Sequence, residues 1–501
     1  MLLDTNAILL LAFLGFFKIT VDWLLDRSKD VHEIYLTQQS TVESTREADE
    51  TAVHKSNKLD YSNGLRVGLD IRYDHYKLRN GNLCDVWEVL INSLKKNDEK
   101  TIEIYKKKIL VSELNFKVEC LQHYFKSRGI KKVGIHIKHF IKSEAVLVII
   151  MACFINQTLV NLYDDIDVTE GVDLYFGELK QENSLSLDPN GNRSVYEILE
   201  EGKSTTFENI YTFKKDKGVA LTLTRKINEK FLSSTSFTQL NLISGLASSI
   251  KHLPNKHSID ENDRLLIIQS SNASNEEILN ELIKILMSFT TNCDLTIAGS
   301  MKWEDVKSYS PTVLSLSESE FAATCSLDEM KRTLTTIQKV KHYIKCRFLE
   351  REIFSRLQVF PCSIRLIYLH KSVGSKYLLS LAEINEYRSL LNSRIILESG
   401  YYRIAGPFIL TDFYDYRLLP IQYKNIMGYG CLSQSVEIKV INKDNIGTVL
   451  IRGYTIGKTT MQFSSMPNEK RTEGNESNCG YMPLSDVKGK FGTDGCLYIY
   501  R

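Results

Sequence analysis

A lysine-rich turn is the first group of residues that could do chemistry. Lys214, Lys215 and Lys217 lie close together and are followed by Gly218. Clustered ammonium groups beside a flexible glycine can bind a phosphate, because the charge attracts it and the backbone can approach it closely. The alternative is a solvated turn without a ligand, which is the more common role of such a polar segment.

The ten cysteines do not have the spacing of a metal site or a disulfide framework. No two of them form a CxxC pair, and no histidine cluster accompanies them. Structural zinc sites and secreted disulfide scaffolds depend on such patterns. We therefore predict no metal ligands among them and interpret them as reduced thiols.

Alternating helices and strands are predicted to position the polar residues. A helix that ends at Gly129 precedes an apolar strand over 133–137, and the same alternation follows through a helix begun by Ser143 and a strand over 158–163. A second alternating block covers about 265–399, and short strands with glycine-rich turns follow from about 430. This pattern predicts an α/β fold with two doubly wound subdomains and a smaller β-rich subdomain, a distorted barrel.

The N-terminus carries the one predicted membrane signal. Residues 7–17 are continuously apolar, and Lys18 and Asp22 then interrupt the run. We expect a membrane anchor over residues 1–27 with the main body on the cytosolic side, because basic residues follow the run. A signal peptide and a helix lying on a surface are the alternatives.

The predicted domain order follows from these segments. Polar residues 28–83 are expected to form a linker, 84–430 an α/β domain and 431–501 a β-rich subdomain. The 63 basic and 61 acidic residues nearly balance and are mixed along the chain. Such a balance gives no reason to expect nucleic acid as a partner.

Several blocks of the chain resemble the adenylate-forming (AMP-binding) enzymes, most closely the long-chain fatty acyl-CoA synthetases. Asn161–Asp164 resembles the family's "PLYD", and residues 364–373 (IRLIYLHKSV) resemble "RLMVTGAAPV". Residues 447–453 (GTVLIRG) resemble "GEILVRG", and residues 485–501 resemble "GDVGKWLPNGTLKIIDR". The matches follow in order over about 84–501, and the resemblance implies the family fold.

The resemblance also implies a set of nucleotide-binding residues. The family's phosphate loop, YTSGTTGxPKG, aligns with residues 211–218, where Thr212, Lys217 and Gly218 keep their types. Tyr401 aligns with the aromatic residue that stacks on adenine. Asp486 aligns with the carboxylate that accepts the ribose hydroxyls, and Arg501 with the arginine that ends that block. The structural alternatives are a turn carboxylate for Asp486 and a frayed terminus for Arg501.

Other family positions are altered. The SGTTG core of the loop is absent, and Asp216 would repel a phosphate. The glutamate that ligates magnesium in the family falls at Ile404 or Ala405, which cannot ligate a hard cation,. The family histidine near the substrate is missing from residues 268–274. The smaller C-terminal lid domain that follows Arg501 in the family is also expected to be absent, and no catalytic residue can be assigned.

The resemblance implies a function that these changes weaken. The family reaction joins a fatty acid to CoA through an acyl-adenylate, with ATP, Mg²⁺ and CoA as cofactors. We expect weak or no ligase activity here. The alternatives are a pseudoenzyme that binds acyl chains, acyl-CoA or a nucleotide, and a structural or partner-binding scaffold. The expected location is the cytosolic face of the endoplasmic reticulum or a lipid droplet, with the membrane as one partner.

Overall fold

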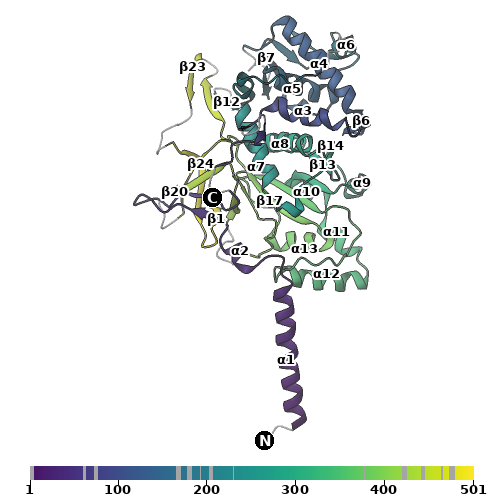
Figure 1. Cartoon of the computed structure of the whole chain (residues 1–501), viewed down its shortest axis with the longest axis vertical. Helices are drawn as coiled ribbons and strands as arrows, with labels where there is room; N and C mark the ends of the chain where they lie inside the picture. Colours follow the sequence, from purple (N-terminus) through teal and green to yellow (C-terminus); the bar gives the residue numbers. More distant parts are fainter. Residues whose placement is uncertain are drawn as a thin grey trace.

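The computed structural model describes most of the chain. The described residues are 5–59, 64–72, 77–164, 171–177, 183–191, 193–201, 207–228, 231–376, 378–419, 426–441, 446–463, 466–472 and 480–500. Two large sheets and their covering helices form the body, and the first helix projects from one end of it (Figure 1). The predicted mixed α/β fold is confirmed.

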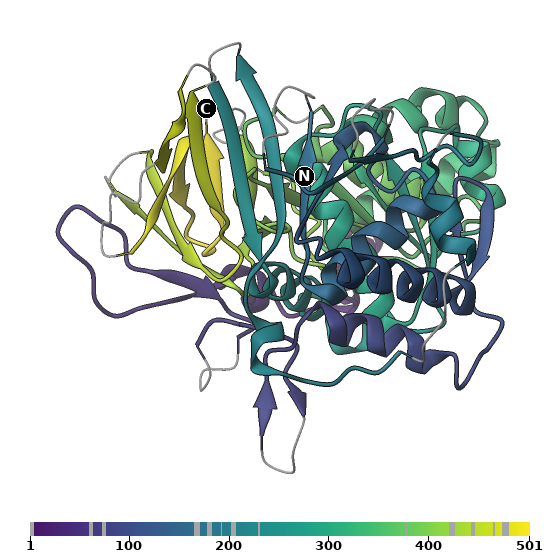
Figure 2. The same ribbon diagram turned by 90° about the horizontal axis from the view of Figure 1, so that it is seen from above.

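The smaller of the two large sheets has eight strands in the order β10-β9-β7-β8-β11-β12-β22-β23. Its first five strands are parallel, and its last three are antiparallel to their neighbours. The long strands β11 and β12 lie beside the yellow C-terminal strands in Figure 2. The bounds are β7 Lys132–His136, β8 Leu159–Tyr163, β9 Leu174–Phe176, β10 Ser184–Leu185, β11 Val219–Asn228, β12 Phe231–Thr238, β22 Lys458–Phe463 and β23 Met466–Thr472.

The larger sheet has fifteen strands in the order β1-β2-β20-β21-β24-β25-β19-β18-β17-β16-β15-β13-β14-β5-β6. The strands from β17 to β5 are parallel, and the remainder of the sheet is antiparallel. The parallel strands are β5 Thr101–Ile104, β13 Arg264–Gln269, β14 Asp294–Gly299, β15 Val313–Ser317, β16 Leu366–Ser372 and β17 Arg394–Gly400. The antiparallel strands are β1 Ser40–Val42, β2 His54–Ser56, β6 Lys107–Leu110, β18 Ile409–Leu410, β19 Ile426–Leu432, β20 Val436–Ile441, β21 Gly447–Gly453, β24 Met482–Phe491 and β25 Leu497–Tyr500. A separate hairpin pairs β3 Ile71–Arg72 with β4 Leu78–Arg79.

Helices cover the parallel strands and form the core with them. One hydrophobic cluster joins α3, α4, α5, α7 and α8 to both sheets, and α5 is buried along almost its whole length. Its residues are nearly all apolar, which is why the sequence buries it on every side. The principal helices are α3 Leu83–Ser93, α4 Val111–Arg128, α5 Glu144–Asn156, α7 Gln239–Lys251, α8 Asn275–Thr291, α12 Thr336–Leu349 and α13 Leu381–Leu391. The shorter helices are α2 Glu33–Thr37, α6 Val195–Glu201, α9 Trp303–Ser308, α10 Glu318–Thr324 and α11 Leu327–Arg332.

The first helix, α1 Thr5–Arg27, gives the predicted anchor no support. Lys18 and Asp22 interrupt its apolar sequence. Within the part of the chain that the structure describes, none of the helices is both long and apolar enough to cross a membrane.

The segment expected to be a linker contains regular structure. Strands β1 and β2 pair with each other, and β2 pairs with β20 at the edge of the large sheet. The His54 ring stacks on Phe491 at 3.6 Å, and its Nδ1 lies 2.8 Å from the Ser40 hydroxyl. A polar sequence can therefore join a sheet here, because backbone pairing and two specific side-chain contacts replace an apolar face.

Candidate functional site

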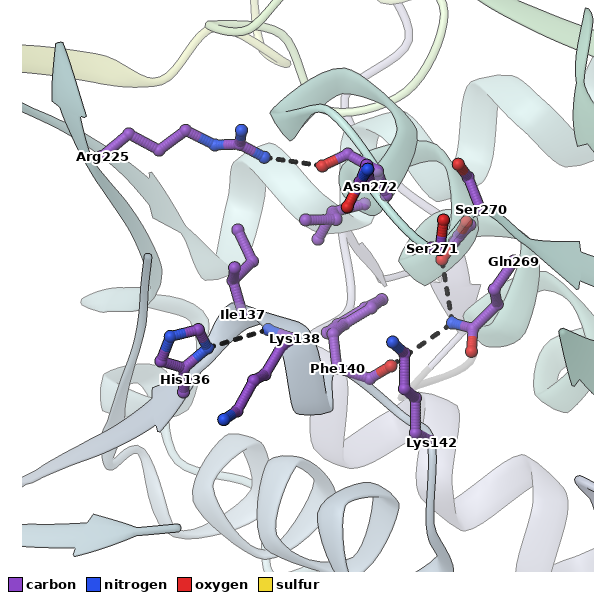
Figure 3. Close-up of a pocket in the computed structure, with 13 residues that line it drawn as sticks. His136, Ile137, Lys138, Phe140, Lys142, Arg225, Gln269, Ser270, Ser271 and Asn272 are labelled. Carbon is purple, nitrogen blue, oxygen red and sulfur yellow. Dashed lines mark hydrogen bonds between the residues drawn. The ribbon is translucent and has the colours of Figure 1, made fainter. Parts of the chain in front are cut away.

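A cavity of about 270 Å³ lies where the two large sheets approach each other (Figure 3). The carboxyl ends of β7 and β13 and the loop before α8 form its walls, and Arg225 of β11 reaches in from the side. Its polar lining residues are His136, Lys138, Lys142, Arg225, Gln269, Ser270, Ser271, Asn272 and Glu281. The volume is slightly below the ~300–1,000 Å³ of small-molecule sites, so it suits a head group better than a whole large ligand.

The cavity is positively charged. Lys138, Lys142 and Arg225 line it, whereas Glu281 is the one carboxylate among the described lining residues. Burial raises the pKa of Glu281 to about 8, against a usual value of 4.5. At neutral pH this side chain is therefore largely protonated. An anionic group such as a carboxylate or phosphate has the matching charge.

Hydrogen bonds hold two of the lining side chains in place. The Gln269 amide donates to Glu281 Oε2 at 2.9 Å, and Tyr105 donates its hydroxyl to Gln269 Oε1 at 3.1 Å. Arg225 donates through Nη2 to the Ala273 carbonyl at 2.7 Å and through Nε to Asn275. The guanidinium thus fixes the loop that leads into α8, where Ser274 caps the helix. The cavity wall is therefore preorganised.

The residues aligned with the phosphate loop lie together in the loop before β11. Thr212 is exposed and precedes a short 3₁₀ helix, Phe213–Asp216. The Lys217 ammonium lies 4.2 Å from the centre of the Phe213 ring, and Gly218 adopts a left-handed φ of 102°. Thr212, Lys217 and Gly218 do not line the described cavity.

Asp216 attaches this loop to the neighbouring structure. Its carboxylate accepts hydrogen bonds from Asn82 Nδ2 at 2.9 Å and from the Tyr211 hydroxyl at 2.8 Å. Arg79 lies 3.9 Å from the same carboxylate and stacks over the Tyr211 ring. Asn82 caps helix α3, so the loop is attached to the start of that helix. These residues do not fit a triphosphate, because a carboxylate occupies the middle of the loop.

The other aligned residues lie in the larger sheet. Tyr401 is buried in a hydrophobic cluster that also contains Val487, the neighbour of Asp486. Asp486 is exposed on β24 with a φ of 60°, within an irregularity of the pairing between β21 and β24. Neither residue lines the described cavity. The prediction for Arg501 falls outside the described residues.

Polar residues stand at the end of β16, where Ser372 pairs with Gly400, the residue before Tyr401. The family sequence RLMVTGAAPV has small residues where this chain has His370, Lys371 and Ser372. His370 is buried, and burial lowers its pKa to about 3. Lys371 is also buried, donates to the Met427 carbonyl at 2.7 Å and has a pKa lowered to about 8 by burial. The sequence alone already shows that polar residues replace the family's small ones at these positions, and this difference could have predicted the altered site.

A buried ion pair behind these residues was not expected from the sequence. The Lys284 ammonium lies 2.6 Å from Glu398 Oε1, and both side chains are almost completely buried. Lys284 also lies 3.4 Å from the centre of the Tyr368 ring. Ile404 and Ala405, which align with the magnesium glutamate, are buried and apolar. Among the described residues, no group of three or more His, Cys, Asp or Glu side chains could hold a metal ion.

Sequence comparison finds one similar protein of uncharacterized function. No protein-family model matches the chain. The "Putative uncharacterized protein YHR045W" of Saccharomyces cerevisiae is 26% identical over 562 residues, covering 100% of this chain and 99% of that protein.

Solved structures of adenylate-forming enzymes share the fold. ATP-bound MatB from Rhodopseudomonas palustris has a TM-score of 0.59 at 12% identity, covering 84% of this chain and 78% of that one. The N-terminal domain of FACL13 from Mycobacterium tuberculosis has a TM-score of 0.57 at 12% identity, covering 84% and 100%. The luciferase-like enzyme of the Zophobas morio mealworm has a TM-score of 0.58 at 11% identity, covering 87% and 98%. The chain therefore has the fold of the adenylate-forming enzymes' N-terminal domain.

Proposed function

We propose that this chain is a divergent acyl-CoA synthetase-like protein that binds the anionic head group of an acyl ligand and has weak or no ligase activity. The observation that carries the proposal is the cationic cavity between the sheets, which Lys138, Lys142 and Arg225 line together with a largely neutral Glu281. A fatty acid and acyl-CoA are the ligand classes that the fold and the charge favour together.

The predicted loss of turnover rests on the nucleotide-binding positions. Asp216 is engaged with Asn82 and Tyr211 in the loop that would hold a triphosphate. Loss of a single preorganised donor can cost an enzyme about 10²–10³ in rate. ATP, Mg²⁺ and CoA would be the cofactors of an active enzyme, and the residues present do not fit ATP with Mg²⁺. The family's long-chain substrate preference is part of this proposal.

The direct test measures binding and turnover separately. The full chain is assayed for pyrophosphate release that depends on ATP and palmitate, and calorimetry measures the binding of ATP, CoA, palmitate and palmitoyl-CoA. We expect binding of palmitate or palmitoyl-CoA without turnover above background. Turnover well above background would refute the predicted inactivity.

Variants of the cavity locate the binding site. Lys142→Gln and Arg225→Gln each remove one cation from the lining, whereas Lys95→Gln removes an exposed cation elsewhere. We expect each cavity variant to weaken acyl-ligand binding about tenfold, the size of one charge-assisted hydrogen bond, and the control to bind normally. If none of the acyl ligands binds the parent protein, the scaffold alternative is favoured instead. The location at the endoplasmic reticulum or a lipid droplet stays a prediction.

A further inference from the structure

Helix α12, Thr336–Leu349, presents an apolar face to solvent. Ile337 is 71% exposed, Val340 54% and Tyr343 61%, and Ile344 is exposed beside them. Residues 337, 340 and 344 repeat at helical spacing, so they form one continuous stripe. A helix on the surface of a globular protein normally turns such a stripe toward the core.

The buried face of α12 is polar instead. Gln338 donates to the Val359 carbonyl at 3.2 Å, and His342 lies 2.8 Å from the Ser389 hydroxyl. Lys345 is fully buried and donates to the Leu357 carbonyl at 3.0 Å. These hydrogen bonds fix the rotation of the helix. The exposed apolar stripe is therefore a built feature, because turning it inward would leave buried polar groups unpaired.

Basic residues predominate around the stripe, although Arg347, which lies over the Tyr343 ring, pairs with Glu350 just after the helix at 2.8 Å. The α12 sequence, TIQKVKHYIKCRFL, contains four basic residues and no acidic residue. Lys339 is exposed and Lys341 half-buried, and both flank the stripe. Lysines beside an apolar helical face are typical of helices that lie in the interface of an anionic bilayer.

A second exposed apolar surface lies at the same end of the molecule. Helix α1 projects from the body beside α12 (Figure 1), and Arg351, just after α12, pairs with Asp22 of α1 at 3.1 Å. The exposed large apolar side chains of α1 include Phe13, Phe16, Phe17, Ile19 and Trp23. Two exposed apolar surfaces at one end, one of them flanked by lysines, match a lipid surface better than a compact protein partner.

We propose that the exposed face of α12 docks on an anionic lipid bilayer. Ile337, Val340, Tyr343 and Ile344 enter the boundary between head groups and acyl chains, while Lys339 and Lys341 contact the anionic head groups. This contact needs no helix that crosses the membrane, and it does not depend on the function of the cavity.

The test is co-sedimentation of the full chain with vesicles of equal parts phosphatidylcholine and phosphatidylserine. The apolar variant is Ile337→Ser/Val340→Ser, and the charge variant is Lys339→Gln/Lys341→Gln. We expect each pair of substitutions to lower vesicle binding about tenfold. We also expect added salt to weaken vesicle binding by the parent more than binding by the charge variant. Thermal melting should change little, because three of the four substituted side chains are exposed and Lys341 is only half-buried.

Matched controls are Leu378→Ser and Lys95→Gln, which remove an exposed apolar and an exposed basic side chain away from α12. These variants should bind vesicles like the parent. Equal binding by the α12 variants and the parent would overturn the proposal, and it would assign any lipid binding to α1. A dimer in solution that the Ile337→Ser/Val340→Ser variant abolishes would also overturn it, because a second copy would then cover the stripe.

Discussion

Replacing Glu281 by glutamine should remove a large part of the pH dependence of stability. The folded state raises the pKa of this carboxyl from 4.5 to about 8, chiefly by burial, while the Gln269 hydrogen bond opposes the rise. A group whose pKa is raised in the folded state stabilises fully below its unfolded pKa, and this contribution is lost as pH rises through the folded value. The relevant window is therefore from about pH 4.5 to about pH 8.

The magnitude follows from that window. One extra proton on the folded state gives a slope of about 1.4 kcal/mol per pH unit, so the parent should lose roughly 3–4 kcal/mol between pH 5 and pH 8 through this residue. Glutamine mimics the protonated acid and can still accept the hydrogen bond from Gln269. The variant should therefore lack this loss and be more stable than the parent at pH 8.

The assay is urea unfolding of parent and variant at several pH values between 5 and 8. The difference between the two free energies of unfolding isolates Glu281, because all other titrating groups are common to both proteins. Glu99→Gln, at an exposed glutamate, is the control and should leave the difference unchanged with pH. Parallel pH profiles for the parent and Glu281→Gln would refute a protonated Glu281, and the ionised carboxylate would then offset one of the three lining cations.

Two further predictions concern the core beside the cavity. Glu398→Gln leaves the buried Lys284 ammonium without its counter-charge, so the free energy of unfolding measured in urea should fall by ~3–5 kcal/mol,. Adding Lys284→Met should restore part of the loss, and no recovery would contradict the pairing. Gly400→Ala places a Cβ 2.6 Å from the His370 ring carbon Cε1, which should cost about 1–3 kcal/mol in thermal or urea unfolding,. The double variant Gly400→Ala/His370→Ala should recover part of the lost free energy of unfolding. An equal loss with and without the His370 ring would show that the clash involves another residue.

Local signals in the sequence predicted individual elements well. Helix α4 ends at Gly129, whose φ of 65° is the left-handed value that glycine adopts most easily, and α5 begins after Ser143 as expected. Helices α11 and α12 are separate, because Thr335 caps a new helix with its side chain. A capping box of this kind is local and was readable from the sequence.

Long-range pairing was not readable in the same way. Strand β12 pairs with β22 although more than two hundred positions separate them, and β2 joins the sheet from a polar segment. Such contacts depend on which edges remain open after the parallel core has formed, and periodicity carries no information about that. The expected division at 430 and 431 stays a prediction, since β17, β18 and β19 run on as neighbours in one sheet.

The resemblance to the family's phosphate loop identified aligned residues, but it did not predict the contacts that these residues make. Lys217 and Gly218 keep the family residue types, yet Lys217 contacts Phe213 and the adjacent Asp216 attaches the loop to α3. The cationic cavity uses residues from β7, β11, β13 and α8, which no single motif contains.

Buried polar residues gather at the ends of β16 and β17. His370, Lys371 and Glu398 are polar residues at the ends of β16 and β17, and burying them is costly unless the surroundings compensate,. Glu398 is compensated by Lys284 and Lys371 by the Met427 carbonyl. The cavity beyond β13 is instead open and lined by Lys138, Lys142 and Arg225, and the proposed binding of an anionic head group rests on this arrangement.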